Sequence, residues 1–191
     1  MDKQIIEERL KSFKYLILDG DGVLFSGDEY RGVLPDGKII VMKSRHYHDS
    51  QGLTFLRAIG IKVLFATAEG EPMTSVVEKL NNLPGVLNGS FELVTSLVNL
   101  QKNRSKVESI EKQLTKEGLN WDDCIYIGDD RTDLESMKKA GLAVTPSDGQ
   151  RLIKKIAHLV LSKKGGGGAI REFAEMVLDA RGIDESTLPS A

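Results

Sequence analysis

Residues 15–23 read Tyr15-Leu16-Ile17-Leu18-Asp19-Gly20-Asp21-Gly22-Val23, and this stretch decides how the rest of the chain is interpreted. Its four leading apolar residues, bounded by turn residues, predict a buried strand of a parallel sheet. Asp19 and Asp21 come just past the carboxyl end of that strand, where open α/β sheets bind ligands. Two carboxylates so close together repel each other unless a cation compensates them. The stretch alone leaves two interpretations open: an active site with a hard metal ion and a nucleophile, or a surface turn, since Asp-Gly is a common turn dipeptide.

Length and composition exclude several classes of function. The 191 residues suit one domain with a full hydrophobic core. A formal net charge of −2 with 28% charged residues provides no basic field for nucleic acid. No stretch approaches the roughly 20 apolar residues of a membrane span, and the charged N-terminus does not resemble a signal peptide. The single cysteine, Cys124, excludes an internal disulfide framework and fits a reducing compartment, so we expect a cytoplasmic protein.

Strand and helix patterns alternate along the chain. Besides the first strand, apolar runs predict strands near residues 61–66, 91–94, 124–127, 142–144 and 159–161. Amphipathic patterns predict helices near residues 1–13, 50–59, 72–80, 105–117, 134–140, 149–156 and 170–178. This alternation predicts an α/β fold, a doubly wound parallel sheet of Rossmann-like type with helices on both faces.

Two segments depart from the alternation. Residues 25–48 contain two strand-like stretches separated by Pro35-Asp36-Gly37, which predicts a β-hairpin directly after the acidic pair. Residues 165–191 begin with four glycines and form a glycine-rich C-terminal tail, whose backbone we expect to be flexible or closely approached by its neighbours. No large cap insertion interrupts the pattern, so residues 1–191 are predicted to form a single domain.

Polar residues follow three of the predicted strands: Asp19 and Asp21 the first, Thr67 the second, and Asp129, Asp130 and Asp133 the third. Because the carboxyl ends of such strands meet at one edge of a doubly wound sheet, acidic groups about 110 positions apart can share one cation. Oxygen ligands favour magnesium over zinc. A calcium-binding loop beginning at Asp19 is the competing interpretation, and its spacing does not fit, because the sixth position is Leu24 and the twelfth is Tyr30.

These residues carry a family resemblance. The acidic pair, Thr67, the helix-borne Lys106 and Gly128-Asp129-Asp130 resemble, in order, the four motifs of the haloacid dehalogenase superfamily phosphatases. The hairpin, the missing cap and the tail sequence Gly166-Gly167-Gly168-Ala169-Ile170-Arg171-Glu172 resemble one capless branch of that superfamily. The branch contains the 3-deoxy-D-manno-octulosonate 8-phosphate phosphatases and the phosphatase-like domains of sialate cytidylyltransferases. The resemblance extends from about residue 13 to residue 180.

The resemblance implies a two-step phosphatase mechanism. Asp19 is expected to be the nucleophile that forms an aspartyl-phosphate, and Asp21 to protonate the leaving group and then activate water. Mg²⁺ is expected to be held by Asp19, the backbone carbonyl of Asp21 and Asp129.

The remaining motif residues are expected to assist this chemistry. Thr67 and Lys106 would bind the phosphoryl oxygens, with Lys106 neutralising their charge. Asp130 and Asp133 would orient Lys106 and hold water behind the metal. Taken alone, Lys106 resembles a solvated helix residue; its position at a helix start before Gly128 favours the functional role.

Three further residues bear on the substrate. Family members that act on the octulosonate phosphate usually carry Thr-Gly-Arg at the second motif, where this chain has Thr67-Ala68-Glu69, which resembles the branch that handles nine-carbon sialic-acid-type 9-phosphates. Asp49 resembles a residue at the mouth of the family's site. Arg171 is either a surface charge or a substrate contact, and the resemblance favours the contact. We therefore expect a 2-keto-3-deoxy sugar acid phosphate as substrate, with Asp49, Glu69 and Arg171 as specificity residues.

Other interpretations remain beside this one. His46 and His48 would share one face of a strand and could bind zinc, although the neighbouring sequence offers no third or fourth ligand. The chain could also be a catalytically silent assembly module, like the vertebrate cytidylyltransferase domain, or a phosphatase of broad small phosphoesters. Because no cap encloses the site, the resemblance implies a homotetramer packed through the hairpins.

Overall fold

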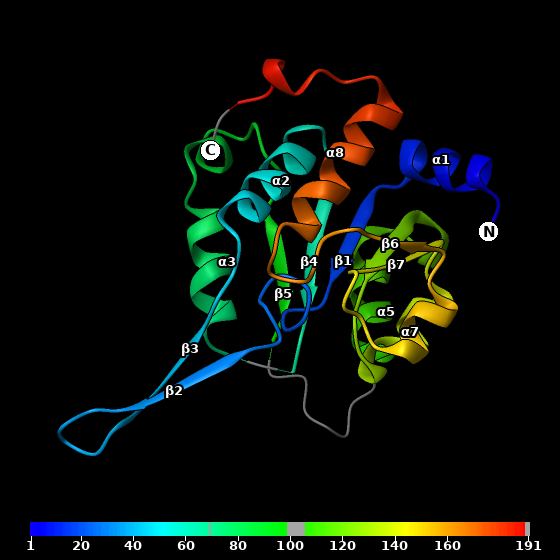
Figure 1. The fold of residues 1–191 in the computed structure, drawn as a ribbon. Helices are drawn as coiled ribbons and strands as arrows, with labels where there is room; N and C mark the ends of the chain where they lie inside the picture. Colours follow the sequence, from blue (N-terminus) through cyan, green and yellow to red (C-terminus); the bar gives the residue numbers. More distant parts are fainter. Residues whose placement is uncertain (69, 99–105, 190–191) are drawn as a thin grey trace.

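A six-stranded parallel sheet forms the centre of the computed structural model, which describes residues 1–68, 70–98 and 106–189 (Figure 1). Its strands are β1 (Tyr15–Leu18), β4 (Lys62–Ala66), β5 (Val94–Leu97), β6 (Cys124–Ile127), β7 (Leu142–Thr145) and β8 (Leu159–Val160). They lie in the order β5-β4-β1-β6-β7-β8, with every neighbouring pair parallel. The predicted doubly wound α/β fold is confirmed, and β1 lies between the two strands that carry the other motifs.

Helices cover both faces of this sheet. They are α1 (Lys3–Ser12), α2 (Tyr47–Ala58), α3 (Met73–Asn81), α4 (Pro84–Leu87), α5 (Lys106–Glu117), α6 (Leu134–Lys139), α7 (Arg151–Ile156) and α8 (Ala169–Arg181). Short 3-10 helices lie at Trp121–Asp123, Arg131–Asp133 and Glu185–Thr187. None of the helices in the described part of the chain is long and apolar enough to cross a membrane.

The two faces of β1 explain why its sequence is apolar throughout. Successive side chains of a strand point to opposite faces. Leu16 and Leu18 therefore pack into one core with α1, α2, α3 and α8, whereas Tyr15 and Ile17 pack into a second core with α5, α6 and α7. A strand buried on both faces has no position for a polar residue until it ends, and here it ends at Asp19.

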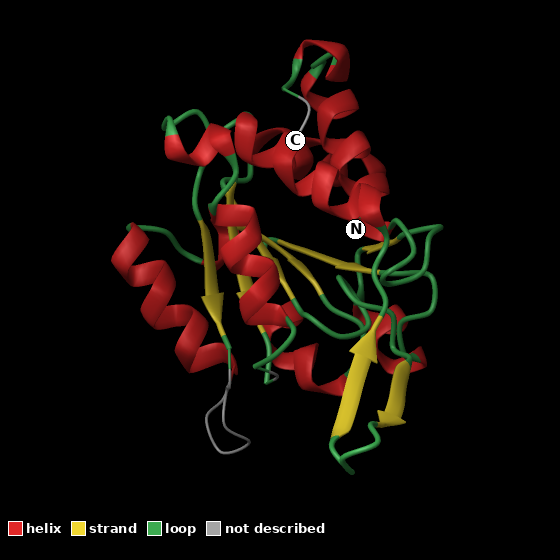
Figure 2. Cartoon of the chain, turned by 90° about the vertical axis from the view of Figure 1, so that its left-hand side faces the viewer, coloured by secondary structure: helices red, strands yellow, loops and turns green. Residues whose placement is uncertain are grey.

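The predicted hairpin is formed by β2 (Glu29–Val33) and β3 (Ile39–Lys43), and it projects away from the sheet (Figure 2). Its turn contains Pro35-Asp36-Gly37, and Gly37 adopts a φ of +83°, which favours glycine. At its base, the N–H of Ser26 donates to the carbonyl of Ser44 at 2.9 Å, so the hairpin is tied to the loop that follows β1.

Among the element boundaries that differ from the prediction, those of β5 and α2 differ by three residues at the start of the element. The strand expected at residues 91–94 lies at Val94–Leu97, because Phe91 is buried against Gly85 and the side chain of Asn81 hydrogen-bonds both the N–H and the carbonyl of Val94. The helix expected from residue 50 begins at Tyr47. His46 is its N-cap and His48 lies in its first turn, so the expectation that both share a strand face is wrong.

A buried carboxylate joins α2 to the beginning of α8. Asp49 has no solvent-exposed surface, and it accepts hydrogen bonds from the N–H of Gly168 at 3.1 Å and of Arg171 at 2.9 Å. Gly168 is the N-cap of α8 and provides no side chain of its own. Asp49 therefore satisfies the free N–H groups of another helix and places a negative charge at that helix's N-terminus, where it is favourable.

Replacing Asp49 with alanine is expected to lower the free energy of unfolding by about 2–4 kcal/mol, because hydrogen bonds to a charged, buried group are lost. Urea denaturation measures this change. Asp179→Ala, which removes an exposed carboxylate of α8, serves as the control and should change stability by less than about 0.5 kcal/mol. Equal stability of the two variants would contradict the anchoring role of Asp49.

Candidate active site

The carboxyl ends of β1, β4 and β6 meet at one cleft. Asp19 follows β1, Thr67 follows β4, and Asp129 lies one residue beyond Gly128 at the end of β6. The cleft is lined by Asp19, Asp21, Gly22, Gly27, Thr67, Ala68, Lys106, Asp129, Asp130, Thr132 and Gln150. The structure thus brings the four predicted motifs together, as the parallel sheet requires.

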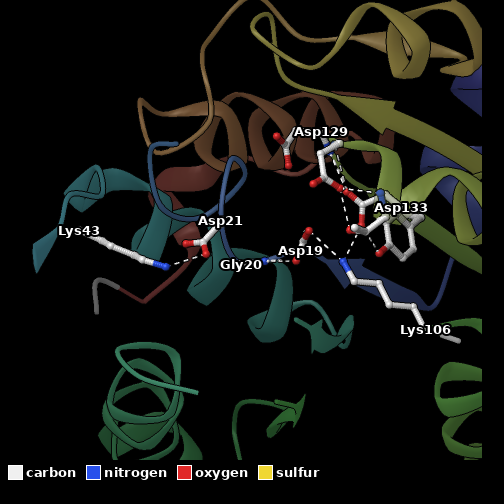
Figure 3. A network of polar contacts seen from close by, with 10 residues as sticks. Asp19, Gly20, Asp21, Lys43, Lys106, Asp129 and Asp133 are labelled. Carbon is white, nitrogen blue, oxygen red and sulfur yellow. Dashed lines mark hydrogen bonds and ion pairs between the residues drawn. The ribbon is translucent and has the colours of Figure 1, made fainter. Parts of the chain in front are cut away.

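Lys106, the first residue of α5, bridges two carboxylates in this cleft (Figure 3). Its Nζ lies 2.9 Å from Oδ2 of Asp19 and 2.8 Å from Oδ1 of Asp133. Burial lowers the pKa of Lys106, but the charges of Asp133 and Asp19 raise it, and the net pKa lies above the usual value. The ammonium group therefore stays charged beside the carboxylate that is expected to attack phosphorus.

Asp133 is fully buried and surrounded by donors. The hydroxyl of Tyr126 donates to its Oδ1 at 2.7 Å, and the N–H groups of Asp129 and Asp130 donate to its Oδ2 at 3.0 and 3.3 Å. A Cβ at Gly128 would lie 2.6 Å from Asp133, so only glycine fits there. Asp133 therefore fixes both the loop after β6 and the position of Lys106.

Three carboxylates in the cleft lie close enough to hold one cation. One carboxylate oxygen from each of Asp19, Asp129 and Asp133 lies within 4.8 Å of the others. Oδ1 of Asp129 is buried and has no hydrogen-bond partner. A buried carboxylate oxygen without a partner is costly, and a hard cation satisfies it with the oxygen ligand that it prefers. The residues present therefore fit a divalent metal ion.

The pKa values of these carboxyl groups point the same way. Burial, together with the charges of Asp133 and Asp130, raises the pKa of Asp129 to about 7. Burial and the charge of Asp133 also raise the pKa of Asp19, against the opposing effect of Lys106. Additional positive charge in the cleft would lower both pKa values and favour the ionised carboxylates.

Gly22 makes the close approach between the first and the fourth motif possible. It adopts a φ of +72°, and a Cβ at this position would lie 2.2 Å from Cγ and Oδ2 of Asp129. Any side chain here would occupy the space of the Asp129 carboxylate. The second glycine of the Asp-Gly-Asp-Gly stretch is therefore a steric requirement of the site.

Asp21 is turned away from the acidic cluster and toward the hairpin (Figure 3). Its Oδ2 lies 2.6 Å from Nζ of Lys43, the last residue of β3, whose side chain is only 9% exposed. Lys43 did not emerge from the sequence analysis. The sequence spacing between Lys43 and Asp21 does not predict their contact. The contact depends on the pairing of the two hairpin strands, which places Lys43 opposite Glu29 at the base of the hairpin.

Neither Asp49 nor Arg171, two of the predicted specificity residues, is part of this cleft lining. Glu69 lies outside the described residues. Asp49, in α2, is buried against the start of α8. Arg171 hydrogen-bonds Gln51 at 2.9 Å, forms ion pairs with Glu175 and Glu185, and lies over the ring of Phe55 at 4.8 Å. Arg171 lines a separate surface pocket with His46, His48 and Gly168.

The histidine pair does not join a metal-binding group. Within residues 1–68, 70–98 and 106–189, the acidic cluster described above is the one group of three or more metal-capable side chains. The rings of His46 and His48 contact each other edge to face, with centroids 4.8 Å apart, and Nδ1 of His46 accepts from the N–H of His48. In this structure the pair therefore belongs to the start of α2.

Comparisons with known proteins show the family to which the chain belongs. Residues 38–173 match the family of haloacid dehalogenase-like hydrolases. The 3-deoxy-D-manno-octulosonate 8-phosphate phosphatase of Escherichia coli K12 is 30% identical over 179 residues, covering 93% of this chain and 86% of that protein. The solved structure of the cobalt-bound deoxy-D-mannose-octulosonate 8-phosphate phosphatase of Haemophilus influenzae is 26% identical, with a TM-score of 0.75 and coverage of 91% of this chain and 92% of that one.

A protein whose name gives a different activity is also similar to this chain. N-acylneuraminate cytidylyltransferase B of Danio rerio is 25% identical over 95% of this chain, which spans only 42% of that longer protein. By contrast, the phosphatases match over most of their own length. Together with the family match over more than half of the chain, they identify it: the protein belongs to the haloacid dehalogenase-like hydrolases and is a phosphatase.

Proposed function

We propose that the chain is a magnesium-dependent phosphomonoesterase that hydrolyses a 2-keto-3-deoxy sugar acid phosphate through an aspartyl-phosphate. The observation that carries the proposal is one cleft in which Asp19 contacts Lys106 and lies close to Asp129, whose Oδ1 is buried without a hydrogen-bond partner. The names of the Escherichia coli and Haemophilus influenzae relatives support 3-deoxy-D-manno-octulosonate 8-phosphate. Glu69 supports a nonulosonate 9-phosphate as the alternative within the same class.

The proposed reaction has two displacements at phosphorus. A carboxylate oxygen of Asp19 forms a bond to phosphorus while the bond to the sugar oxygen breaks, and Asp21 gives its proton to that oxygen. Water then attacks the aspartyl-phosphate, Asp21 takes a proton from it, and the bond between Asp19 and phosphorus breaks to release inorganic phosphate. The contact with Nζ of Lys43 would fix the position of the Asp21 side chain, which has to take up a proton before the first displacement.

The phosphoryl group is bound by positive charge and by donors. Lys106 would neutralise the charge that spreads over the phosphoryl oxygens, and Thr67 would donate a hydrogen bond to them. Mg²⁺ would be held by Asp19, Asp129 and the backbone carbonyl of Asp21, and when bound it would offset the repulsion between the nucleophile and the phosphate. Asp130 and Asp133 would support the metal and Lys106 from behind.

Asp19→Asn is expected to abolish phosphate release, by about 10⁴-fold or more in kcat, because the amide cannot form the covalent intermediate. The assay compares an aryl phosphate, octulosonate 8-phosphate and a nonulosonate 9-phosphate with and without Mg²⁺. Asp36→Asn, in the hairpin turn, is the matched control and should retain activity. If the aryl phosphate has a specificity constant equal to that of both sugar acids, the enzyme is a broad phosphatase and the substrate class is wrong.

Mg²⁺ binding is expected to weaken as the pH falls below about 7. The pKa of Asp129 is raised to about 7, so the metal has to displace a proton below that pH, and its affinity should fall about tenfold per pH unit. The stability of the metal-free protein depends on pH in the opposite direction. The folded state holds the Asp129 proton more tightly than the unfolded state, so the free energy of unfolding falls as the pH rises from about 4 to about 7. Calorimetric titration between about pH 6 and pH 8 measures the binding, and a flat profile would contradict the role of Asp129.

We also propose a homotetramer packed through the hairpins, in the cytoplasm. The hairpin exposes apolar side chains that a lone copy would leave in water, namely Tyr30, Val33, Ile39, Val41 and Met42. An exposed apolar ribbon of this kind is typical of an interaction surface. The single Cys124 agrees with a reducing compartment.

Light scattering should give a mass near four times the 21.0 kDa of one chain. Val41→Lys is expected to dissociate the assembly, because a charge would be buried between apolar side chains. Leu87→Lys, at an exposed apolar residue of α4 outside the hairpin, is the control and should leave the mass unchanged. A wild-type mass of one chain would exclude the tetramer.

A further inference from the structure

The glycine run at the start of the tail lies directly against the loop that carries the acidic pair. The N–H of Gly166 donates to the carbonyl of Val23 at 2.8 Å, and a Cβ at Gly166 would lie 2.1 Å from the nitrogen of Ser26. A Cβ at Gly165 would lie 1.8 Å from the carbonyl oxygen of Gly22. The backbones of the two segments are therefore in contact without any side chain between them.

On its other side, Gly22 contacts the acidic cluster. As described above, a Cβ at Gly22 would lie 2.2 Å from the Asp129 carboxylate. Gly22 is thus enclosed between the backbone of Gly165 and the carboxylate of Asp129. A displacement of Gly22 by a side chain at position 165 would therefore press on Asp129, whose Oδ1 is buried without a partner.

The run itself is held in place by hydrogen bonds at both ends. The N–H of Gly165 donates to Asp148 at 3.0 Å, and the N–H of Gly168 donates to Asp49. Upstream, the carboxylate of Glu172 accepts from the N–H groups of Ser162 and Lys163. A segment fixed in this way cannot easily move aside when a side chain is added to it. The resulting strain would therefore fall on the loop at Gly22.

We infer that Gly165 is a positioning residue for the metal site: its missing side chain sets the distance between Gly22 and Asp129. The inference rests on the proposed function, since it assumes that the acidic cluster holds Mg²⁺. It assigns a role to the tail within its own subunit. That role is independent of any contact of the tail with substrate or with a neighbouring copy.

Gly165→Ala tests the inference, because Gly165 does not need a positive φ and the nearest atoms to the added methyl group belong to the backbone of Gly22 and Val23. Misplacing a supporting group of a metal site typically costs about 10–100-fold in metal affinity, and we expect a loss of this size for Mg²⁺. Calorimetric titration of Mg²⁺ into the metal-free protein measures it without any substrate. Gly167→Ala is the matched control, because the three atoms nearest to its Cβ would all belong to Lys164, the nearest at 3.1 Å, and none to the loop that follows β1. It should bind Mg²⁺ like the wild type.

A purely structural role of Gly165 would lower the stability of the metal-free variant in urea and leave its Mg²⁺ affinity unchanged, which would overturn the inference. If Gly165→Ala does not fold, Glu172→Ala loosens the run through its upstream end without adding volume. It should weaken Mg²⁺ binding by a smaller factor, and an unchanged affinity there would equally overturn the inference. If the wild-type protein binds no Mg²⁺, the proposed function fails instead.

Discussion

Repulsion between carboxylates is the constraint on which this structure depends. Asp19, Asp129 and Asp133 lie within 4.8 Å of one another and are largely removed from water, where like charges interact strongly. Lys106 compensates Asp19 and Asp133, and backbone N–H groups and Tyr126 compensate Asp133 further. The buried Oδ1 of Asp129 has no such partner, and it defines the place where a cation is needed.

Much of the fold could be predicted because the strands are buried on both faces. The central strands β1, β4 and β6 are short and almost wholly apolar, and the polar residues that follow them, Asp19, Thr67 and Asp129, mark the edge of the sheet where the site lies. The boundary of β5 could not be found this way. It is set by tertiary contacts, in which the side chain of Asn81 pairs with Val94 and Phe91 is buried outside the strand.

The site was predictable where a motif fixes it and unpredictable where a long-range contact does. The four motif positions follow strand and helix ends and converge as expected. Nothing in the sequence around Asp49 indicates that this residue caps α8, which lies more than a hundred residues further along the chain. Lys43 reaches Asp21 only because of the register of the hairpin. The tail glycines were expected to be flexible or closely approached, and the structure shows the close approach, against the loop that follows β1.

The attachment of the hairpin has a mechanical consequence. The hairpin is joined at Ser26 and Ser44 to the loop that follows β1, and Lys43, at the base of the hairpin, forms an ion pair with Asp21. Strands of five residues extend about 17 Å, so a tilt that moves the tip by several ångströms moves the base by only a fraction of that. Holding the tips still would therefore restrict the movement of the Lys43 ammonium group at the base, and with it the movement of the Asp21 carboxylate that it contacts.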